Sequence, residues 1–494
     1  FFSGPESFTP DTQYLLGETP EVKNLFTCCG FNSIGIASSG GAGRVTAEWM
    51  MNGYINEDLF SLDIKRFQKF HSDKKFIMER VTETLGDLYA MHWPHKQHQT
   101  SRNQILFPYH EELKKAGACF GTMGGFERPM WYALDGDEAK YKYSFENQNW
   151  YKSVEFETKN ARQNVGLFDF SSFSKFDLKG TNVHQELQRI CTANIKNEIG
   201  KTTYTHMLNE SAGIETDLTV VCMGKDYFRI VGSAGSRERD KYHILKHLHE
   251  DIELTDVTEK ICCLGLFGPY SRDMISKMSE DKFSTDKFPF GTGKNIKVKG
   301  IDVWAQRLSY VGELGYELYV SSNQAKCLYL KIIEEGKNFK LSHCGMHAMD
   351  TMRMESGFLH WGNDISPEEN QYQAGLSFTV SYKKNINFVG KDELLKIKNK
   401  KLSKQMMMFT LKDSEPNHPL LLHEEPIYLE DKIIGRTTSG NYSFCFKKNL
   451  SFGYINSGNT KEILKSKNLY IEVEKKKYPV DILDKPLNQK NYKI

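Results

Sequence analysis

Asp217 and Glu313 are two carboxylates that the sequence places beside predicted β-hairpins. Asp217 directly precedes the apolar run 218–222, which predicts a buried strand, and 227–231 predicts the returning strand. Because aspartate is depleted inside strands, we expect Asp217 at the point where the chain enters the strand. A carboxylate held there can accept a proton from an amine or stabilise a cation. The alternative is an aspartate that caps the turn by binding local N–H groups.

Glu313 lies in a glycine-flanked turn over 311–315, between the predicted strands 303–310 and 316–320. Its ordinary interpretation is a solvated turn residue. Both segments therefore place a carboxylate at the mouth of a predicted hairpin.

An apolar helix face is predicted where Met346, Met349 and Met352 recur at a spacing of three. Arg353 and Trp361 lie on the adjacent face. An arginine there can pair with a carboxylate of a ligand, and an indole can stack on a flat ring. The alternative for Arg353 is an internal salt bridge, with Glu355 or elsewhere.

Composition limits the classes of function. The chain has 494 residues, so two to four domains are expected. A formal net charge of +2 gives no sign of a nucleic-acid partner, and no apolar run is long enough to cross a bilayer. The ten cysteines include two adjacent pairs, which we interpret as reduced thiols in a cytosol-like compartment.

Two histidine groups have spacings seen in metal sites. His343 and His347 are four apart but lack the glutamate of H-E-x-x-H, and His92, His95 and His98 flank a proline that breaks helical spacing. The sequence therefore predicts no metal site.

A glycine-rich stretch precedes a predicted helix near the N-terminus. The run 40–44 predicts a turn that opens a helix over 45–51. Such a turn can face an anion or a polarised carbonyl, and a plain strand-to-helix connection is the alternative. Residues 65–89 are predicted to be mainly helical.

Segments along the whole chain resemble, in order, the sarcosine and dimethylglycine dehydrogenase family, which joins a flavin-dependent amine oxidoreductase to an aminomethyltransferase-type (T-protein-like) folate domain. The resemblance implies an α+β multidomain fold. The segments are 26–44, 102–131, 167–176, 207–220, 263–272, 307–317, 353–365 and 388–391. The expected parts are the remnant C-terminal end of an FAD-dependent oxidoreductase domain (1–60), a central connector domain (61–135), a linker (136–150), an aminomethyltransferase-like folate-binding domain (151–395) and a small C-terminal β-barrel (396–494).

The resemblance implies that FAD oxidises a methylated amine, sarcosine or dimethylglycine, and that tetrahydrofolate receives the one-carbon unit as 5,10-methylenetetrahydrofolate. The G-x-G-x-x-G flavin fingerprint is absent, so we expect the N-terminal flavin-binding part to be missing from this chain. The electron acceptor would be oxygen or an electron-transfer flavoprotein. The expected location is the cytoplasm, or the mitochondrial matrix in a eukaryote.

The same resemblance assigns roles to individual residues. Asp217 is the expected catalytic residue, and Trp361 stands where the family commonly has tyrosine. The residues expected to bind folate are Tyr204, Tyr227, Glu313, Arg353 and Trp361. Those expected to face the flavin in the full-length protein are Gly30, Phe31, Asn32, Ser33, Gly35 and Ile36.

Three alternatives stay open. A stand-alone aminomethyltransferase of the glycine cleavage type would leave 1–135 unexplained. A non-catalytic regulatory subunit, resembling that of pyruvate dehydrogenase phosphatase, shares the architecture. A folate-dependent demethylase acting on another methylated donor is the third.

Overall fold

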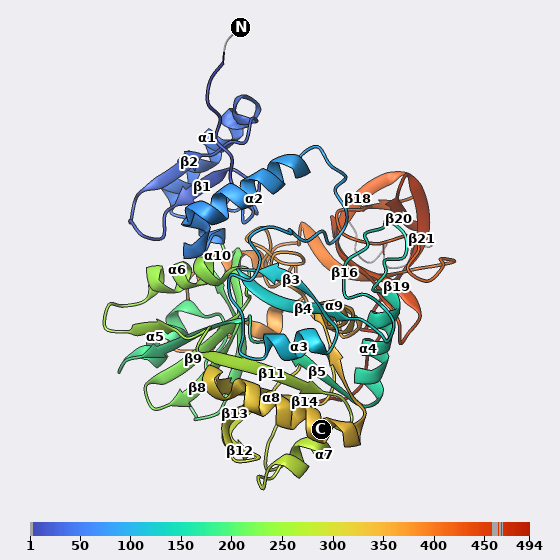
Figure 1. The fold of residues 1–494 in the computed structure, drawn as a ribbon. Helices are drawn as coiled ribbons and strands as arrows, with labels where there is room; N and C mark the ends of the chain where they lie inside the picture. The colour runs from blue at the N-terminus through green and yellow to red at the C-terminus, as the bar shows by residue number, and fades with distance from the viewer. Residues whose placement is uncertain (1–2, 457–462, 464–465, 467) are drawn as a thin grey trace.

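The computed structural model describes residues 3–456, 463, 466 and 468–494. Part of the predicted barrel segment, namely 457–462, 464–465 and 467, lies outside the described residues. Figure 1 shows an N-terminal unit, two β-sheets with helices, and a C-terminal barrel that follow one another along the chain. The predicted α+β multidomain class and the C-terminal barrel are confirmed.

The N-terminal unit consists of a short antiparallel ribbon covered by one helix. Its elements are β1 (Leu15–Glu18), β2 (Phe26–Cys29) and α1 (Gly35–Asn52). The prediction of a helix that begins at residue 45 is wrong, because α1 already contains the glycine run 40–44. The helix is held by a buried stripe of Ala42, Val45 and Trp49, and this packing outweighs the poor helix propensity of glycine.

The connector contains less helix than its composition suggests. Its elements are η1 (Ile64–Arg66), η2 (Lys69–Ser72), α2 (Lys74–Asp87), α3 (His110–Lys115), β3 (Ala118–Met123) and β4 (Phe126–Tyr132). The predicted helix over 65–89 begins only at Lys74, because the Asp73 side chain accepts the N–H of Phe76 and caps α2 there.

Two sheets build the middle of the molecule. The five-stranded sheet has the order β10-β6-β9-β8-β7, and the six-stranded sheet has the order β12-β13-β14-β11-β5-β15. The strands of the first are β6 (Ser174–Lys179), β7 (Thr202–Leu208), β8 (Ile214–Gly224), β9 (Tyr227–Gly232) and β10 (Glu253–Asp256). Those of the second are β5 (Val165–Asp169), β11 (Ile261–Phe267), β12 (Thr292–Val298), β13 (Ile301–Arg307), β14 (Gly315–Ser321) and β15 (Leu341–Cys344).

The inner faces of these sheets share one hydrophobic cluster. Val221 of β8, Trp304 of β13 and Tyr319 of β14 all belong to it. Because side chains alternate along a strand, Asp217 is on the same face of β8 as Val221. The space between the sheets is therefore where polar groups of both can meet. The helices around the sheets are α4 (Tyr151–Gln163), α5 (Val183–Ile190), α6 (Arg237–His247), α7 (Ser271–Met278), α8 (Ser322–Gly336), η3 (Lys337–Phe339), α9 (Met346–Glu355), η4 (Ser377–Thr379) and α10 (Lys391–Lys398).

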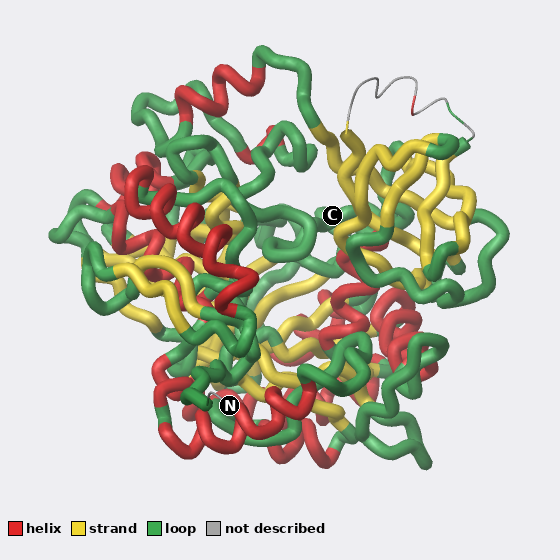
Figure 2. The backbone as a smooth tube through the Cα atoms, turned by 90° about the horizontal axis from the view of Figure 1, so that it is seen from above, coloured by secondary structure: helices red, strands yellow, loops and turns green. Residues whose placement is uncertain are grey.

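The C-terminal region closes into a barrel with the order β16-β19-β18-β17-β20-β21. Figure 2 shows its strands gathered apart from the helices. They are β16 (Lys404–Leu411), β17 (Pro426–Leu429), β18 (Lys432–Ser443), β19 (Lys448–Asn456), β20 (Leu469–Val473) and β21 (Lys476–Leu483). Among the described residues, no helix has the length and apolar character needed to cross a membrane.

Candidate functional site

Asp217 lies inside β8 and not at its entrance. It pairs with His206 of β7 in the antiparallel register. The predicted position at the strand end is therefore wrong, because β8 begins three residues earlier, at Ile214. A carboxylate in the middle of a strand cannot be a turn cap, so the capping alternative does not apply.

Asp217 has polar neighbours, and none of the described residues is a cationic partner within ion-pair distance of it, apart from the imidazole of His206. The nearest basic atom is His206 Nε2, 3.9 Å from Asp217 Oδ1. Burial lowers the pKa of His206 to about 3, so this imidazole is neutral. Burial raises the pKa of Asp217 to about 7, although a hydrogen bond from Tyr204 opposes the shift. Asp217 can thus exchange a proton near neutral pH, as a general base requires.

Glu317 is a second carboxylate on the inner face, and the sequence-based reasoning did not assign it a role. It lies in β14 opposite Gly265 of β11. Tyr319 donates a hydrogen bond to it across 2.6 Å. Burial raises the pKa of Glu317, while the bond from Tyr319 and the charge of Lys175 oppose the shift. The alternation of side chains in 315–321 was the available clue, because a glutamate two residues from a buried tyrosine shares its face.

Glu313, by contrast, is engaged in an internal network. Its Oε1 accepts hydrogen bonds from Arg162 at 3.0 Å and from Lys490 at 2.9 Å. Arg162 also binds Glu355, at 2.6 Å from Nη2 to Oε2. Only 3% of Glu313 is exposed. These contacts favour a structural role for Glu313 over the folate contact expected from the sequence.

Arg353 is also engaged in hydrogen bonds within the protein. Its guanidinium donates to Asp350 at 2.8 Å, to Asp364 at 2.5 Å and to Ser439 at 2.8 Å. The salt-bridge alternative is therefore what the structure shows, although the partners are Asp350 and Asp364 and not Glu355. A side chain saturated in this way joins α9 to the barrel strand β18.

The remaining aromatic candidates divide between two places. Tyr204 is 38% exposed, and its hydroxyl lies 3.3 Å from His206 Nε2, beside Asp217. Tyr227 donates instead to Asp177, which is also bound by Arg229. Both tyrosines keep their expected role as a proposal, but only Tyr204 lies next to Asp217.

Trp361 is buried in a different cluster. Its Nε1 donates to the carbonyl of Ile214 at 3.0 Å, and its ring packs edge-on against Phe60. The guanidinium of Arg239 lies 4.7 Å from the ring centre. The indole N–H of Trp361 is already hydrogen-bonded, and its ring already contacts Phe60 and Arg239. These contacts favour a structural role for Trp361, which holds the start of β8, over contact with a ligand.

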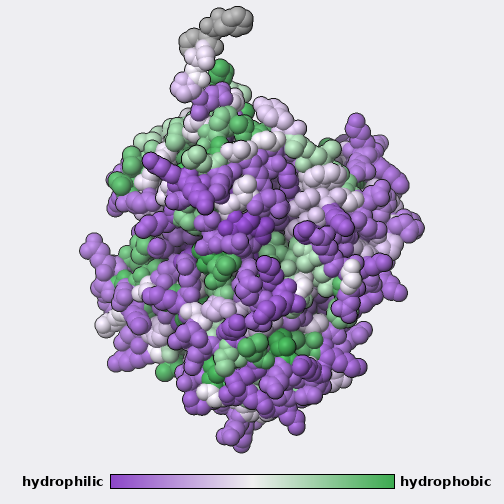
Figure 3. Space-filling model, viewed as in Figure 1, coloured by the Kyte–Doolittle hydropathy of each residue, from purple (hydrophilic) through white to green (hydrophobic). Residues whose placement is uncertain are grey.

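The segment expected to face the flavin forms the entrance to α1. Asn32 and Ser33 have positive φ angles of 50° and 66°, and buried Asn32 accepts the N–H of Thr9. Ile36 is 98% exposed. Figure 3 shows apolar side chains at the top of the view, over the N-terminal unit. The other three residues expected to face the flavin are Gly30, Phe31 and Gly35.

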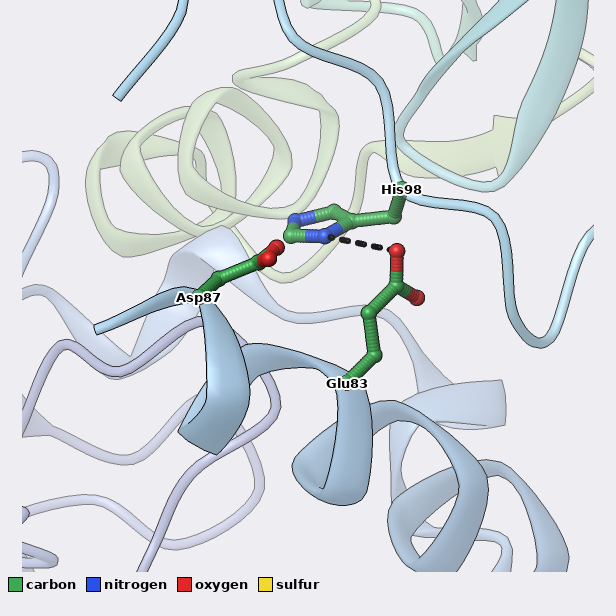
Figure 4. A group of neighbouring side chains, drawn as sticks. All are labelled: Glu83, Asp87 and His98. Atoms are coloured by element: carbon green, nitrogen blue, oxygen red, sulfur yellow. Dashed lines mark ion pairs between the residues drawn. The ribbon is translucent and has the colours of Figure 1, made fainter. Parts of the chain in front are cut away.

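Glu83, Asp87 and His98 form the one group of possible metal ligands found among the described residues (Figure 4). The two carboxylates already have partners. Lys96 Nζ lies 2.5 Å from Asp87, and Glu83 accepts the N–H groups of Gln99 and Thr100. The cluster fixes the loop after α2, while His98 Nδ1 is buried without a hydrogen-bond partner among the described residues, 3.9 Å from Glu83 Oε1.

Family descriptions match the chain in the expected order. They are the FAD dependent oxidoreductase central domain over 52–105, the GCVT N-terminal domain over 109–384 and the Glycine cleavage T-protein C-terminal barrel domain over 404–488. A solved structure of the glycine cleavage system aminomethyltransferase T from Bartonella henselae has the same fold, with a TM-score of 0.66, 22% identity, and coverage of 78% of this chain and 99% of that one.

Two curated relatives extend the likeness over nearly the whole chain. The 4-methylaminobutanoate oxidase (formaldehyde-forming) of Paenarthrobacter nicotinovorans is 38% identical over 443 residues, which cover 90% of this chain and 53% of that protein. The mitochondrial dimethylglycine dehydrogenase of Rattus norvegicus is 30% identical over 494 residues, covering 98% and 56%. The chain therefore spans about half the length of these relatives.

Proposed function

Because the chain belongs to the sarcosine and dimethylglycine dehydrogenase family, with an aminomethyltransferase-type domain over 109–384, we propose that it transfers a one-carbon unit to tetrahydrofolate. The product would be 5,10-methylenetetrahydrofolate. The unit would come from an N-methylated amino acid that the full-length protein oxidises with FAD, and sarcosine and dimethylglycine are the smallest such substrates.

The observation that carries this proposal is the pair of carboxylates between the two sheets. Asp217 and Glu317 come from different sheets, share the faces that pack on one cluster, and both have a raised pKa. Neither has a basic side chain within ion-pair distance among the described residues, apart from the neutral His206. Carboxylates without a cationic partner suit the N–H groups at the edge of a pterin ring.

Asp217 is the proposed base. Tetrahydrofolate supplies a nucleophilic amine that captures formaldehyde or the equivalent iminium carbon. As that amine forms its new bond to carbon it must lose a proton, and the Asp217 carboxylate accepts it. A base with a pKa near 7 is matched to this task at neutral pH, because it is half ionised and can release the proton again.

Glu317 is the proposed pterin ligand in place of Glu313. Tyr319 holds the Glu317 carboxylate through one oxygen and leaves the other available. Tyr204 would cover the ring near Asp217, since more than a third of it is exposed. The segment Gly30–Ile36 keeps its proposed contact with FAD in the full-length protein, and its exposed apolar surface is consistent with that.

The test is an anaerobic titration of the purified chain with tetrahydrofolate, followed by addition of formaldehyde and detection of methylenetetrahydrofolate. We expect Asp217→Asn to bind with a Kd within threefold of the parent but to lose product formation. Glu317→Gln should weaken binding by 10- to 100-fold, because a charged acceptor is replaced by an amide.

Glu313→Gln is the matched control for Glu317→Gln. It removes a carboxylate of the same type from the neighbouring turn, and it should lower thermal stability without changing the Kd. Absence of tetrahydrofolate binding by the folded parent chain would reject the transfer function and favour the regulatory-subunit alternative. Full product formation by Asp217→Asn would reject the role of Asp217 alone.

A further inference from the structure

Gln306 is a buried glutamine of β13 whose amide nitrogen has nothing to bind. Only 1% of the residue is exposed, and its Nε2 is buried without a hydrogen-bond partner among the described residues. Its Oε1 accepts the indole N–H of Trp304 at 3.3 Å. Because an indole N–H can only donate, this bond fixes which side of the amide carries the oxygen. The two N–H groups of Gln306 therefore face away from Trp304, and they are left unpaired.

The neighbour of Gln306 across the sheet is the carboxylate already proposed to bind the pterin. Gln306 of β13 lies directly opposite Glu317 of β14 in the antiparallel register. Side chains in such a pair are on the same face, with Cβ atoms about 4.5–5.5 Å apart. Tyr319 donates to Oε2 of Glu317, and no hydrogen bond joins the carboxylate to Gln306 Nε2. Gln306 and Glu317, here called the polar pair, thus present an unused donor beside an acceptor.

Aromatic rings lie on both sides of the polar pair. The next residues in the same row across the sheet are Gly293 of β12 and Gly265 of β11. A Cβ built on Gly293 would lie 2.7 Å from Nε1 of Trp304, and one built on Gly265 would lie 2.6 Å from Cε2 of Phe267. The rings therefore cover the two glycines. A polar strip between apolar walls suits the edge of a flat heterocycle.

Solvent reaches the space beside the polar pair. Glu317 is partly exposed although it lies in a strand that has neighbours on both sides. The side chain of Asp217, which lies on the inner face of the other sheet, is 15% exposed. A ring edge that binds Glu317 from this space lies within one strand spacing of the Gln306 amide.

We propose that Gln306 selects the ring of the ligand by donating a hydrogen bond to the carbonyl oxygen next to the N–H group that Glu317 accepts. This proposal rests on the proposed function, in which Glu317 binds the pterin. The 4-oxo pterin of tetrahydrofolate has a carbonyl acceptor, a ring N–H and an amino group along one edge. A 4-amino group in place of the carbonyl would oppose the N–H groups of Gln306 with another donor, and both donors would stay unpaired.

The test is a calorimetric titration of the parent chain, Gln306→Glu and Gln306→Met with tetrahydrofolate and with its 4-amino analogue. The readout is the ratio of the two Kd values within each protein, so a loss common to both probes cancels. We expect the parent to prefer the 4-oxo ring by about 100-fold or more, partly through Glu317.

Gln306→Glu keeps the shape of the side chain and the acceptor for Trp304, but it replaces the donor by an acceptor. This variant should lower the preference for the 4-oxo ring at least 10-fold, because the new oxygen can accept the 4-amino group. Gln306→Met should weaken tetrahydrofolate binding by about 3- to 10-fold and lower the preference less, because it removes the hydrogen bond without adding an acceptor.

Gln373→Met is the matched control, since Gln373 is a buried glutamine whose amide is already satisfied. Its Oε1 accepts Asn370 Nδ2 at 2.8 Å, and its Nε2 donates to Ser403 at 3.1 Å. The control should lower the melting temperature and leave the ratio of Kd values unchanged. A substitution that acts only through the fold would behave in the same way at Gln306.

The outcomes separate this role from the transfer function. Tetrahydrofolate binding by the parent with an unchanged ratio in both Gln306 variants would overturn the role of Gln306 and leave the transfer function standing. A ratio that depends on Gln306, in a parent chain that forms no methylenetetrahydrofolate, would support the role of Gln306 and overturn the transfer function. A folded parent chain that binds neither probe would overturn both.

Discussion

Carboxylates in two regions of this protein have opposite surroundings. Between the sheets, Asp217 and Glu317 have tyrosine neighbours and raised pKa values. At the junction of α4 and α9, Glu313 and Glu355 both bind Arg162. The first pair has unused acceptor capacity, and the second pair has its charge compensated within the protein.

This difference distinguishes carboxylates that can bind a ligand from carboxylates that stabilise the fold. A carboxylate with a cationic partner at 3 Å or less needs no ligand, and removing its partner leaves a buried charge. A carboxylate whose pKa is raised by burial gains from any ligand that donates hydrogen bonds to it. Residue type alone does not distinguish these cases, since Glu313 and Glu317 belong to the same short segment, 307–317.

The largest effect is expected on the reaction rate when the carboxylate of Asp217 is removed. Asp217→Asn should lower the rate of methylenetetrahydrofolate formation at least 10³-fold, because an amide cannot accept the proton. In the parent protein, kcat should rise with pH below the Asp217 pKa of about 7 and level off above pH 8, since the carboxylate is the active form. A flat pH–rate profile from pH 5 to 9 would contradict this role.

Substitutions around Glu313 and Glu355 should lower the stability of the protein without changing ligand binding. Arg162→Met leaves Glu313 and Glu355 as buried charges without their common partner, so we expect a loss of about 3–5 kcal/mol in the free energy of unfolding. Chemical denaturation measures it. Arg44→Met, which removes an exposed ion pair on α1, is the control and should cost about 0–1 kcal/mol. Equal losses of unfolding free energy in Arg162→Met and Arg44→Met would contradict a special structural role for the ion pairs of Arg162.

Stability should depend on pH with the sign set by Asp217. Its folded pKa is raised from 3.8 to about 7, so the folded state binds the extra proton between these values. Stability is then fully present below pH 4 and declines by about 1.4 kcal/mol for each pH unit up to pH 7. Asp217→Asn should remove this contribution, and the difference between parent and variant in denaturant midpoints at pH 5 and pH 8 tests it.

The smallest effect is expected for Tyr319→Phe, which tests whether the charge of Glu317 matters for tetrahydrofolate affinity. Tyr319→Phe removes the hydrogen bond that favours the charged form of Glu317, so the pKa of Glu317 should rise further. We expect tetrahydrofolate affinity at pH 7 to fall by about 2- to 10-fold. Recovery of affinity at pH 8.5 would identify the lost charge as the cause, whereas a loss that is independent of pH would point to packing.

The sequence was sufficient for the order of the domains and for the barrel, because the family motifs recur along the whole chain and turn residues separate short apolar runs. It was insufficient for α1, where the glycines at 40–44 indicate a turn and only the tertiary packing of Val45 and Trp49 shows why a helix persists. Propensity was outweighed there by burial.

Within the site, Asp217 is recognisable from the sequence but its pKa is not, because burial in the folded protein raises that pKa. The role of Glu313 follows from the resemblance, and its glycine-flanked turn gives no sign of the ion pairs that occupy this carboxylate. The ion pair with Arg162 joins residues 151 positions apart, and no local pattern predicts it. Arg353 shows the same effect, because its partner Ser439 belongs to the barrel.

The contacts that join α9 and the segment after it to the barrel determine whether the two parts separate after proteolysis. Asp364 accepts hydrogen bonds from Thr438 and Ser439, and Ser443 donates to Glu355. These bonds cross from the segment before residue 398 to strands after residue 431. A protease cut in the connection between α10 and β16 would therefore leave two fragments that co-elute on size exclusion and separate only in denaturant, so an intact elution volume is no proof of an intact chain.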